Sequence, residues 1–270
     1  MKKYDDLKGK WALILGASSG FGAACALELA SEGVNIIGVH LDRKATLPQV
    51  DSLVTKIQEK GCEAIFFNVN AADEEKRGEI ISAITEKISS NDGEPQLRVL
   101  LHSLAFGTLK DFISSMEKTA VTKAQVDMTV DVMANSLVYW VQDLVRKDLL
   151  GKGGRIFALT SAGGAKVWPS YGAVSAAKAA LESHIRQLAL ELAPLEITAN
   201  AIMAGVTDTP ALRKIPGSSE MLEKALQKNP SRRLTLPEDV AKVINVLSQR
   251  KTGWMTGNVI AVDGGEFIVG

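Results

Sequence analysis

The sequence predicts a single α/β domain, a doubly wound parallel sheet of about seven strands with helices on both faces. Three observations predict this fold. Short apolar runs alternate with helix-period segments from one end of the chain to the other. The runs are rich in Val, Ile, Leu and Phe, which is typical of strands buried on both faces. No repeat or Pro/Gly-rich linker divides the sequence, so residues 1–270 are expected to form one domain.

Seven apolar runs are predicted to be strands: Trp11–Leu15, Val34–Val39, Glu63–Phe67, Arg98–Leu101, Arg155–Leu159, Ile197–Ile202 and Val259–Val262. The amphipathic stretches between them are predicted to be helices: Phe21–Ser31, Gln49–Lys60, Glu74–Ser89, Val121–Leu149, Tyr171–Leu192 and Glu238–Gln249. We expect a polar turn over Asn91–Gln96, and expect Gly151–Gly154 to close a helix. Met203–Arg233 is the one long irregular stretch and follows a strand's carboxyl end, which predicts a substrate lid at about 206–233.

A glycine-rich turn follows the first predicted strand directly and opens the first predicted helix. A dinucleotide pyrophosphate needs a tight turn and close approach to backbone N–H groups at the positive end of a helix. Three glycines in seven residues meet that need, and two serines add hydroxyl donors. With a strand before it and a helix after it, the turn predicts a Rossmann-like dinucleotide site. The predicted cofactor-binding residues here are Gly16, Ser18, Ser19, Gly20, Phe21 and Gly22.

Tyr171 and Lys178 are the predicted catalytic pair. A reductase must protonate a substrate oxygen while hydride reaches carbon, and a tyrosine can do so if a nearby cation stabilises its phenolate. A separation of seven residues places both side chains on one face of a helix, about two turns apart. We expect Lys178 to lower the pKa of the phenol and to hold the nicotinamide ribose. Ser161 is the third predicted catalytic residue and would orient a substrate carbonyl, although a turn or helix-cap role for it stays open.

The spacing of the glycine turn, GxxxGxG, together with Asn200–Thr209 and Gly257–Gly265, resembles the short-chain dehydrogenase/reductase family over nearly the whole chain. The resemblance implies further cofactor contacts in three segments. The nicotinamide carboxamide and the phosphates would be contacted by Val206, Thr207 and Thr209. The adenine would be framed by Asn68 and Val69. The segment after the fourth strand would add Ser103, Leu104 and Ala105.

Three departures from the common family pattern point to one subgroup. Tyr171 precedes Lys178 by seven residues where the common spacing is four, and Val174 stands at the usual tyrosine place. The run His102-Ser103-Leu104-Ala105 replaces the common Asn-Asn-Ala-Gly, and Met133 replaces an asparagine. All three resemble the divergent enoyl-acyl carrier protein reductases, most of all their NADPH-dependent third type.

That resemblance implies reduction of the 2,3 double bond of an enoyl thioester. In such a reaction negative charge appears on an oxygen beyond the carbon that receives hydride, so the proton donor must stand farther away. Moving the tyrosine by three helical residues shifts its root by about 4.5 Å, which fits this need. Two alternatives stay open: a 3-oxoacyl-thioester or other carbonyl reductase, and a catalytically silent NAD(P)-sensing regulator.

NADPH is the predicted cofactor, with NADH as the alternative. Counting from the last glycine of the turn, His40 takes the place of the acid that binds the ribose 2′-hydroxyl in NAD-dependent relatives. Arg43 and Lys44 follow and could hold a 2′-phosphate. Asp42 lies only two residues beyond His40, and it would favour NADH if it binds the ribose.

Composition limits which partners and ligands are expected. Lys plus Arg equals Asp plus Glu, 31 against 31, so nucleic acid is not an expected partner. The two cysteines and three histidines have no metal-ligand spacing, and no metal site is expected. The N-terminal apolar run is too short for a secretory signal and no run approaches transmembrane length, so we expect a cytoplasmic protein without a membrane partner. The resemblance implies an acyl thioester on acyl carrier protein or coenzyme A, and a homotetramer.

Overall fold

The computed structural model describes residues 6–88, 97–115 and 119–269. The strands form one parallel seven-stranded sheet in the order β3-β2-β1-β4-β5-β6-β7. Their bounds are β1 Trp11–Leu15, β2 Asn35–His40, β3 Ala64–Asn68, β4 Leu97–His102, β5 Leu150–Ser161, β6 Thr198–Ala204 and β7 Val259–Val262. The predicted doubly wound fold is confirmed, and every predicted strand is present within a few residues of its expected bounds. The predicted turn Asn91–Gln96 and the predicted helix end at Ser89 lie outside the described residues.

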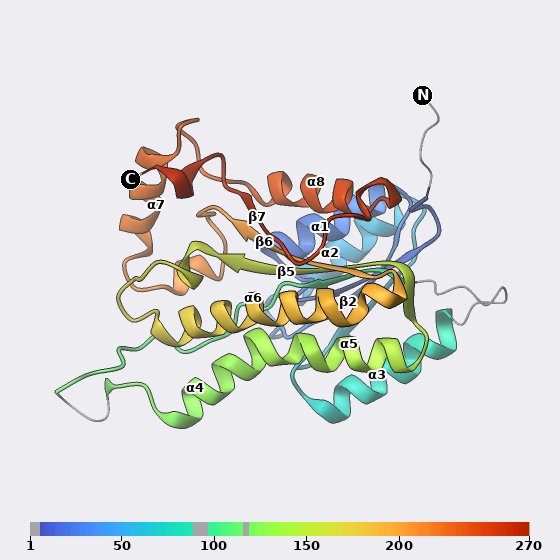
Figure 1. The fold of residues 1–270 in the computed structure, drawn as a ribbon, viewed down its shortest axis with the longest axis horizontal. Helices are drawn as coiled ribbons and strands as arrows, with labels where there is room; N and C mark the ends of the chain where they lie inside the picture. Colours follow the sequence, from blue (N-terminus) through green and yellow to red (C-terminus); the bar gives the residue numbers. More distant parts are fainter. Residues whose placement is uncertain (1–5, 89–96, 116–118, 270) are drawn as a thin grey trace.

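Helices cover both faces of the sheet (Figure 1). One face carries α1 Gly20–Ser31, α2 Leu47–Gln58 and α8 Pro237–Leu247, whose apolar residues share a core with Ile14, Val99 and Ile202. The other face carries α3 Glu74–Ile88, α5 Ser136–Arg146 and α6 Gly172–Leu192, packed on Leu13 and Leu100. Strands β1 and β4 are buried along their whole length, as expected for strands covered on both sides.

The predicted long helix Val121–Leu149 is interrupted. It divides into α4 Lys123–Val130, a π-helical turn Asp131–Asn135 and α5, which ends at Arg146. Gly151–Gly154 does not close this helix, because those glycines lie inside β5. The pairing of β5 with β4 is shifted there, since Leu97 pairs with Leu150 but Val99 pairs with Arg155. Periodicity alone missed the interruption of the helix, because a π turn adds one residue without changing the apolar character of the stretch.

The expected irregular stretch after β6 also contains a regular element. Helix α7, Ser218–Lys228, stands at the end of the molecule near the carboxyl ends of the central strands (Figure 1). A short 3₁₀ turn, Leu212–Lys214, precedes it. The indole N–H of Trp168, in the loop before α6, donates to Pro216 O at 3.1 Å and ties the two segments together. The predicted lid is therefore a helix-bearing flap that contacts the loop leading to Tyr171.

Candidate active site

The glycine turn follows β1, where the strand order of the sheet reverses: β2 and β3 lie on one side of β1, and β4 to β7 lie on the other. In parallel sheets this switch point, between β1 and β4, is where ligands bind. Gly16 has φ +87°, and a Cβ there would lie 2.4 Å from Ser103 O. A Cβ on Gly22 would lie 2.0 Å from Gly16 O. The turn must be this compact for a pyrophosphate to reach the N-terminus of α1, so the close approach fits a dinucleotide cofactor.

The segment after β6 borders the same turn. Thr207 and Thr209 are both buried, and Thr209 Cγ2 would lie 3.5 Å from a Cβ on Gly20. The hydroxyl of Thr207 donates to Gly205 O at 3.0 Å, and Thr209 Oγ1 accepts the N–H of Leu212 at 3.2 Å. The structure therefore brings these predicted phosphate contacts beside the glycine turn, although their hydroxyls already have intramolecular partners.

A polar network marks the end of β2. Nδ1 of His40 lies 3.0 Å from Asp42 Oδ2, and the Thr46 hydroxyl donates to Asp42 Oδ1 at 2.8 Å. Burial tends to raise the pKa of Asp42, but hydrogen bonds from Ser18, Thr46 and His40 outweigh it and hold that pKa below its usual value. Asn68 binds the backbone of Asp42 on both sides, accepting its N–H and donating to its carbonyl. The charged carboxylate of Asp42 is thus fixed next to the glycine turn, with the buried His40 behind it.

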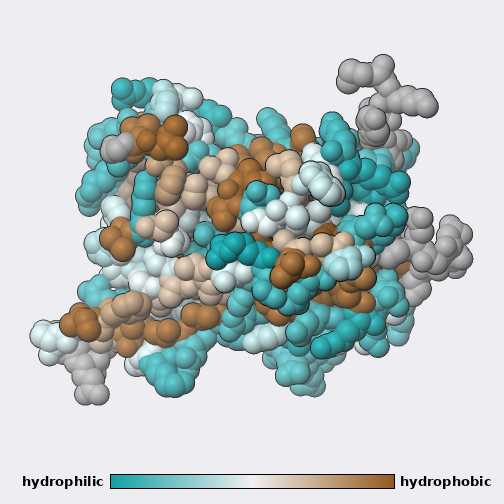
Figure 2. All heavy atoms as spheres, viewed as in Figure 1, coloured by the Kyte–Doolittle hydropathy of each residue, from teal (hydrophilic) through white to brown (hydrophobic). Residues whose placement is uncertain are grey.

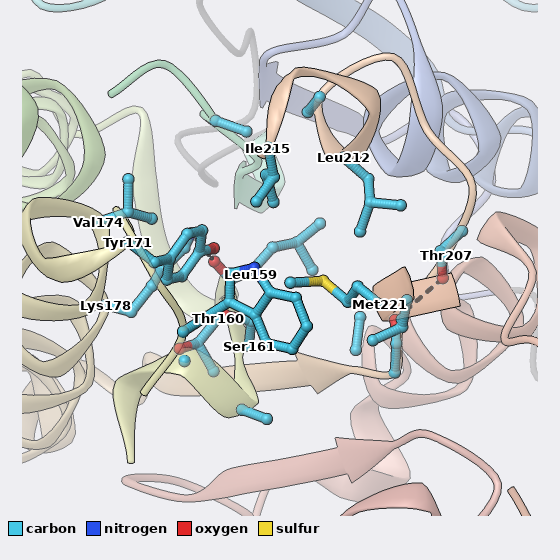
Figure 3. A pocket seen from close by; sticks show the side chains of 18 of the residues that line it. Leu159, Thr160, Ser161, Tyr171, Val174, Lys178, Thr207, Leu212, Ile215 and Met221 are labelled. Atoms are coloured by element: carbon cyan, nitrogen blue, oxygen red, sulfur yellow. Dashed lines mark hydrogen bonds between the residues drawn. The ribbon is translucent and has the colours of Figure 1, made fainter. Parts of the chain in front are cut away.

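Tyr171 is the residue that caps α6. Ser170, just before it, has the left-handed φ of +60°, which costs a non-glycine residue about 1 kcal/mol or more. The Ser170 hydroxyl donates to Asp111 Oδ1 at 2.7 Å and holds this backbone in place. The phenol of Tyr171 points into the pocket toward Ser161, which ends β5 (Figure 3). Sequence spacing had placed Tyr171 inside the helix, whereas the strained residue before it sets where the phenol stands.

The hydroxyl of Ser161 is buried and has no well-formed hydrogen bond among the described residues. It lies close enough to the phenol to lower the pKa of Tyr171, but burial has the larger effect, and the pKa of Tyr171 is raised. The expected lowering of this pKa by Lys178 is absent, so that expectation was wrong for the protein without ligand. A protonated phenol beside an unsatisfied hydroxyl forms a pair of donors ready for a substrate oxygen.

Lys178 lies beneath the phenol and is 6% exposed. Its Nζ donates to Leu159 O at 2.6 Å. Burial lowers the pKa of Lys178 to about 8, and Glu182, one turn along α6, acts in the opposite direction. Glu182 in turn accepts the hydroxyl hydrogen of Thr160 at 2.6 Å. The ammonium is therefore held at the carboxyl end of β5, as a ribose ligand should be, with an acidic partner that the sequence reading did not include.

His102, at the end of β4, is completely buried behind the lysine. Its Nε2 lies 2.9 Å from Ser136 Oγ, whose own hydrogen goes to Val132 O in the π-helical turn. Nε2 must therefore carry the ring proton, and Nδ1 is a buried acceptor without a partner among the described residues. Burial, then the charge of Lys178, lowers the pKa of His102 to about 3, so the ring stays neutral. Through its hydrogen bond to Ser136, His102 supports the π-helical turn.

The π-helical turn presents Met133 to the cavity. The asparagine two residues later, Asn135, lies outside the cavity wall, and its Oδ1 accepts a hydrogen bond from His184 Nε2 on α6 at 3.0 Å. The structure therefore leaves an apolar side chain where the common pattern has an amide.

A cavity of about 580 Å³ is lined by the catalytic candidates Tyr171, Ser161 and Lys178. Its wall also contains these predicted cofactor contacts: Phe21, Ser103, Leu104, Ala105, Val206, Thr207 and Thr209. The other predicted contacts lie outside it: Gly16, Ser18, Ser19, Gly20, Gly22, His40, Arg43, Asn68 and Val69. Leu212, Ile215 and Met221 from the flap stand across from the phenol (Figure 3). Most of this wall is apolar, which suits an acyl chain.

The rim of the cavity mixes exposed apolar and basic side chains. Phe106 and Val167 are exposed at 57% and 94%. Apolar side chains also gather on the segment that projects at the lower left of Figure 2. Lysines from the loop before α6 and from the flap also line it: Lys166, Lys214, Lys224 and Lys228. The sequence does not place these four lysines together, because their shared rim exists only after the flap packs on the loop.

Two arginines of the flap are paired with carboxylates of the same chain. Arg213 pairs with Asp208 at 2.7 Å, and Arg233 pairs with Asp239 at 2.6 Å. Within the described ranges, no cluster of three His, Cys, Asp or Glu side chains could hold a metal ion. Likewise, none of the helices described here has the length and apolar character to cross a bilayer.

The sequence model of a family described as enoyl-(acyl carrier protein) reductase matches residues 16–266. The chain is 30% identical to 1-cyclohexenylcarbonyl-CoA reductase of Streptomyces collinus, covering 96% of this chain and 87% of that protein. It is 29% identical to enoyl-[acyl-carrier-protein] reductase [NADH] of Nostoc, covering 98% and 99%. Versicolorin reductase 1 of Aspergillus parasiticus is 27% identical, with 97% of each chain covered. Among solved structures, the enoyl-[acyl-carrier-protein] reductase (NADH) of Aquifex aeolicus matches with a TM-score of 0.83 at 25% identity, covering 98% of each chain.

Proposed function

The chain belongs to the enoyl-(acyl carrier protein) reductase family of short-chain dehydrogenases/reductases, and on that premise we propose that it reduces the 2,3 double bond of an enoyl thioester. Family members are oxidoreductases that use NAD(H) or NADP(H), so the silent regulator is set aside. A bound nicotinamide nucleotide would supply the hydride. The glycine turn, the segment Val206–Thr209 and Lys178 would hold it.

One observation carries the proposal: the phenol of Tyr171 and the unsatisfied hydroxyl of Ser161 face each other in an apolar cavity beside a buried ammonium. Both hydroxyls can donate to one thioester carbonyl, where negative charge develops during reduction of the double bond. The raised pKa of Tyr171 keeps its proton available at neutral pH. Lys178 would bind the ribose and keep positive charge near that oxygen.

The placement of the phenol supports the enoyl reaction over ketone reduction. Val174, at the common tyrosine place, is buried and puts an aliphatic side chain into the cavity wall. Among the described residues that line the cavity, Tyr171 is the only phenol. The test is side-by-side steady-state kinetics on crotonyl and acetoacetyl thioesters. The proposal expects the crotonyl substrate to have the higher kcat/KM, and a large preference for acetoacetyl would overturn it.

A carbonyl reductase remains the second candidate. The similarity to versicolorin reductase 1, at 27% identity over 97% of the chain, favours it, because that protein is named a versicolorin reductase and not an enoyl reductase. The same kinetic comparison separates the two candidates.

For the nucleotide, NADH has more support than the NADPH that the sequence predicts. The carboxylate of Asp42 is fixed beside Ser18 of the glycine turn, where it can accept a ribose 2′-hydroxyl and would repel a 2′-phosphate. A relative at 29% identity is named as NADH-dependent. Asp42→Ser should lower kcat/KM for NADH while raising that for NADPH. NADPH is favoured instead if the wild-type protein prefers it and Arg43→Ala removes the preference.

The thioester carrier is proposed from the basic rim. Lys166, Lys214 and Lys228 are exposed there and could bind the phosphate that both phosphopantetheine and coenzyme A carry. A crotonyl thioester of N-acetylcysteamine lacks that phosphate and should show a KM at least about tenfold higher. Comparing the KM of the crotonyl thioester of acyl carrier protein with that of the coenzyme A thioester would show which carrier the basic rim binds.

A homotetramer in the cytoplasm is also proposed. Trp254, Met255 and Val259 are exposed at 99%, 40% and 41%, an apolar surface near the edge strand β7 that a second copy of the chain could cover. Light scattering at micromolar concentration tests the assembly, and a monomer there would refute it.

A further inference from the structure

The turn that follows β7 forms part of the cavity wall. Asp263 is buried, and its carboxylate accepts the N–H groups of Gly265 at 2.9 Å and Phe267 at 2.8 Å. From the opposite side, Lys166 donates to Phe267 O at 3.1 Å, and its Nζ lies 4.2 Å from the centre of the Phe267 ring. These contacts hold the turn in one place against the loop that leads to Tyr171.

This turn places Glu266 on the backbone of Val206. Glu266 is half-buried, lines the cavity, and its Oε2 accepts the Val206 N–H at 3.1 Å. The preceding N–H, of Gly205, is already used by Val262 O in the sheet. Val206 is therefore the first N–H beyond the β-ladder at the end of β6. Val206 also belongs to the segment, with Thr207 and Thr209, that the family resemblance assigns to the nicotinamide carboxamide and the phosphates.

One N–H makes one strong hydrogen bond, so Glu266 and a carboxamide oxygen compete for it. We propose that Glu266 occupies the nicotinamide end of the site in the free enzyme and must be displaced when a nicotinamide nucleotide binds. This inference rests on the proposed nucleotide binding at Val206. It assigns Glu266 the role of a gating residue that weakens binding through the nicotinamide half of the ligand and leaves the adenosine half unaffected.

The competition depends on pH. Burial raises the pKa of Glu266, the Val206 N–H lowers it, Asp263 raises it, and Lys166 and Lys228 lower it, with a net upward shift. Asp263 lies in the same turn as Glu266, Lys166 lies in the loop before α6, and Lys228 is at the end of α7. A protonated carboxyl accepts a hydrogen bond less strongly than a carboxylate. Displacement therefore becomes easier, and NADH binding tighter, as the pH falls through the pKa of Glu266.

The test compares two ligands on Glu266→Ala. NADH carries the nicotinamide, and ADP-ribose lacks it but keeps the adenosine and pyrophosphate. At pH 7 the substitution should tighten NADH binding about tenfold, the value of one hydrogen bond to a charged group, and change ADP-ribose binding by less than about twofold. Glu223→Ala, at an exposed position on α7, is the matched control and should change neither dissociation constant.

A second variant keeps the test decisive if Glu266→Ala does not fold. Glu266→Gln still accepts the Val206 N–H but cannot titrate, so its NADH affinity should not change as the pH falls below neutral, while that of the wild type rises. The inference is overturned if Glu266→Ala leaves NADH binding unchanged or weaker, if both ligands shift equally, or if wild type and Glu266→Gln share one pH profile. A wild-type protein that binds neither ligand would instead refute the proposed function.

Discussion

The buried lysine makes a quantitative prediction about nucleotide binding and pH. Lys178 is 6% exposed, and burial lowers its pKa to about 8 from the usual 10.5. Nucleotide binding through ribose hydroxyls needs the ammonium form, which donates hydrogen bonds. Below pH 8 that form is already present in the free enzyme, so Lys178 adds no pH dependence to NADH affinity there, and any change toward acid pH comes from Glu266. Above pH 8 the enzyme must first take up a proton, and affinity should fall.

The size of the effect follows from the linkage between proton uptake and binding. Each pH unit above 8 weakens binding about tenfold until the pKa of Lys178 in the complex is reached. Between pH 7 and pH 9 the dissociation constant for NADH should rise about tenfold. Two other ionisable groups of the site do not titrate in this window, because the pKa of His102 is lowered to about 3 and that of Tyr171 is raised above its usual 10.0.

The assay is a fluorescence titration of NADH at several pH values. Lys178→Met should bind weakly with no dependence on pH between 7 and 9, and Lys152→Met, an exposed lysine paired with Glu196, should behave as wild type. The reasoning is refuted if the wild-type dissociation constant is the same at pH 7 and pH 9.

The same burial has a consequence for folding. The folded-state pKa of Lys178 is below the unfolded value, so the ammonium destabilises the folded protein fully below pH 8, and this cost disappears as the pH rises toward 10.5. A shift of this size corresponds to about 3 kcal/mol, and the lost bond to Leu159 O offsets about 1 kcal/mol. Ligand-free Lys178→Met should therefore be more stable than wild type at pH 7, by about 2 kcal/mol. Lower stability in denaturant unfolding would contradict this reasoning.

Three further predictions concern the phenol, the glycine turn and the flap. Tyr171→Phe should lower kcat on a 2-enoyl thioester by about 10²–10⁴-fold. Its dissociation constant for NADH should stay within about twofold of wild type, and an unchanged kcat would remove Tyr171 from the mechanism. Gly22→Ala should destabilise the fold in thermal unfolding, since its Cβ would lie 2.0 Å from Gly16 O, whereas Gly78→Ala on α3, with open space, should stabilise by up to about 1 kcal/mol. Amide exchange over 210–233 should slow when nucleotide and substrate bind, and equal exchange with and without ligands would exclude a mobile lid.

The order of strands and helices was predictable from the sequence because it depends on local patterns. Apolar runs of strand length gave β1 and β7 with the predicted bounds. The glycine turn could be predicted equally well, because only glycine fits the positive φ at position 16 and the close backbone approach at position 22. The proposed catalytic pair could be picked out for the same reason, since Tyr171 and Lys178 lie within one short segment.

Tertiary structure decided what depends on contacts between distant segments. The direction of the pKa shift of Tyr171 came from burial in a cavity that the ends of β4, β5, β6 and β7 and the flap enclose, and no local pattern encodes that desolvation. Glu266 meets Val206 across 60 residues, and Lys166 meets Phe267 across 101. The sequence by itself thus determined the fold and pointed to the side chains proposed to react. The protonation of those side chains, and which backbone groups are already occupied, follow from packing, because both depend on what the rest of the chain places within a few ångströms.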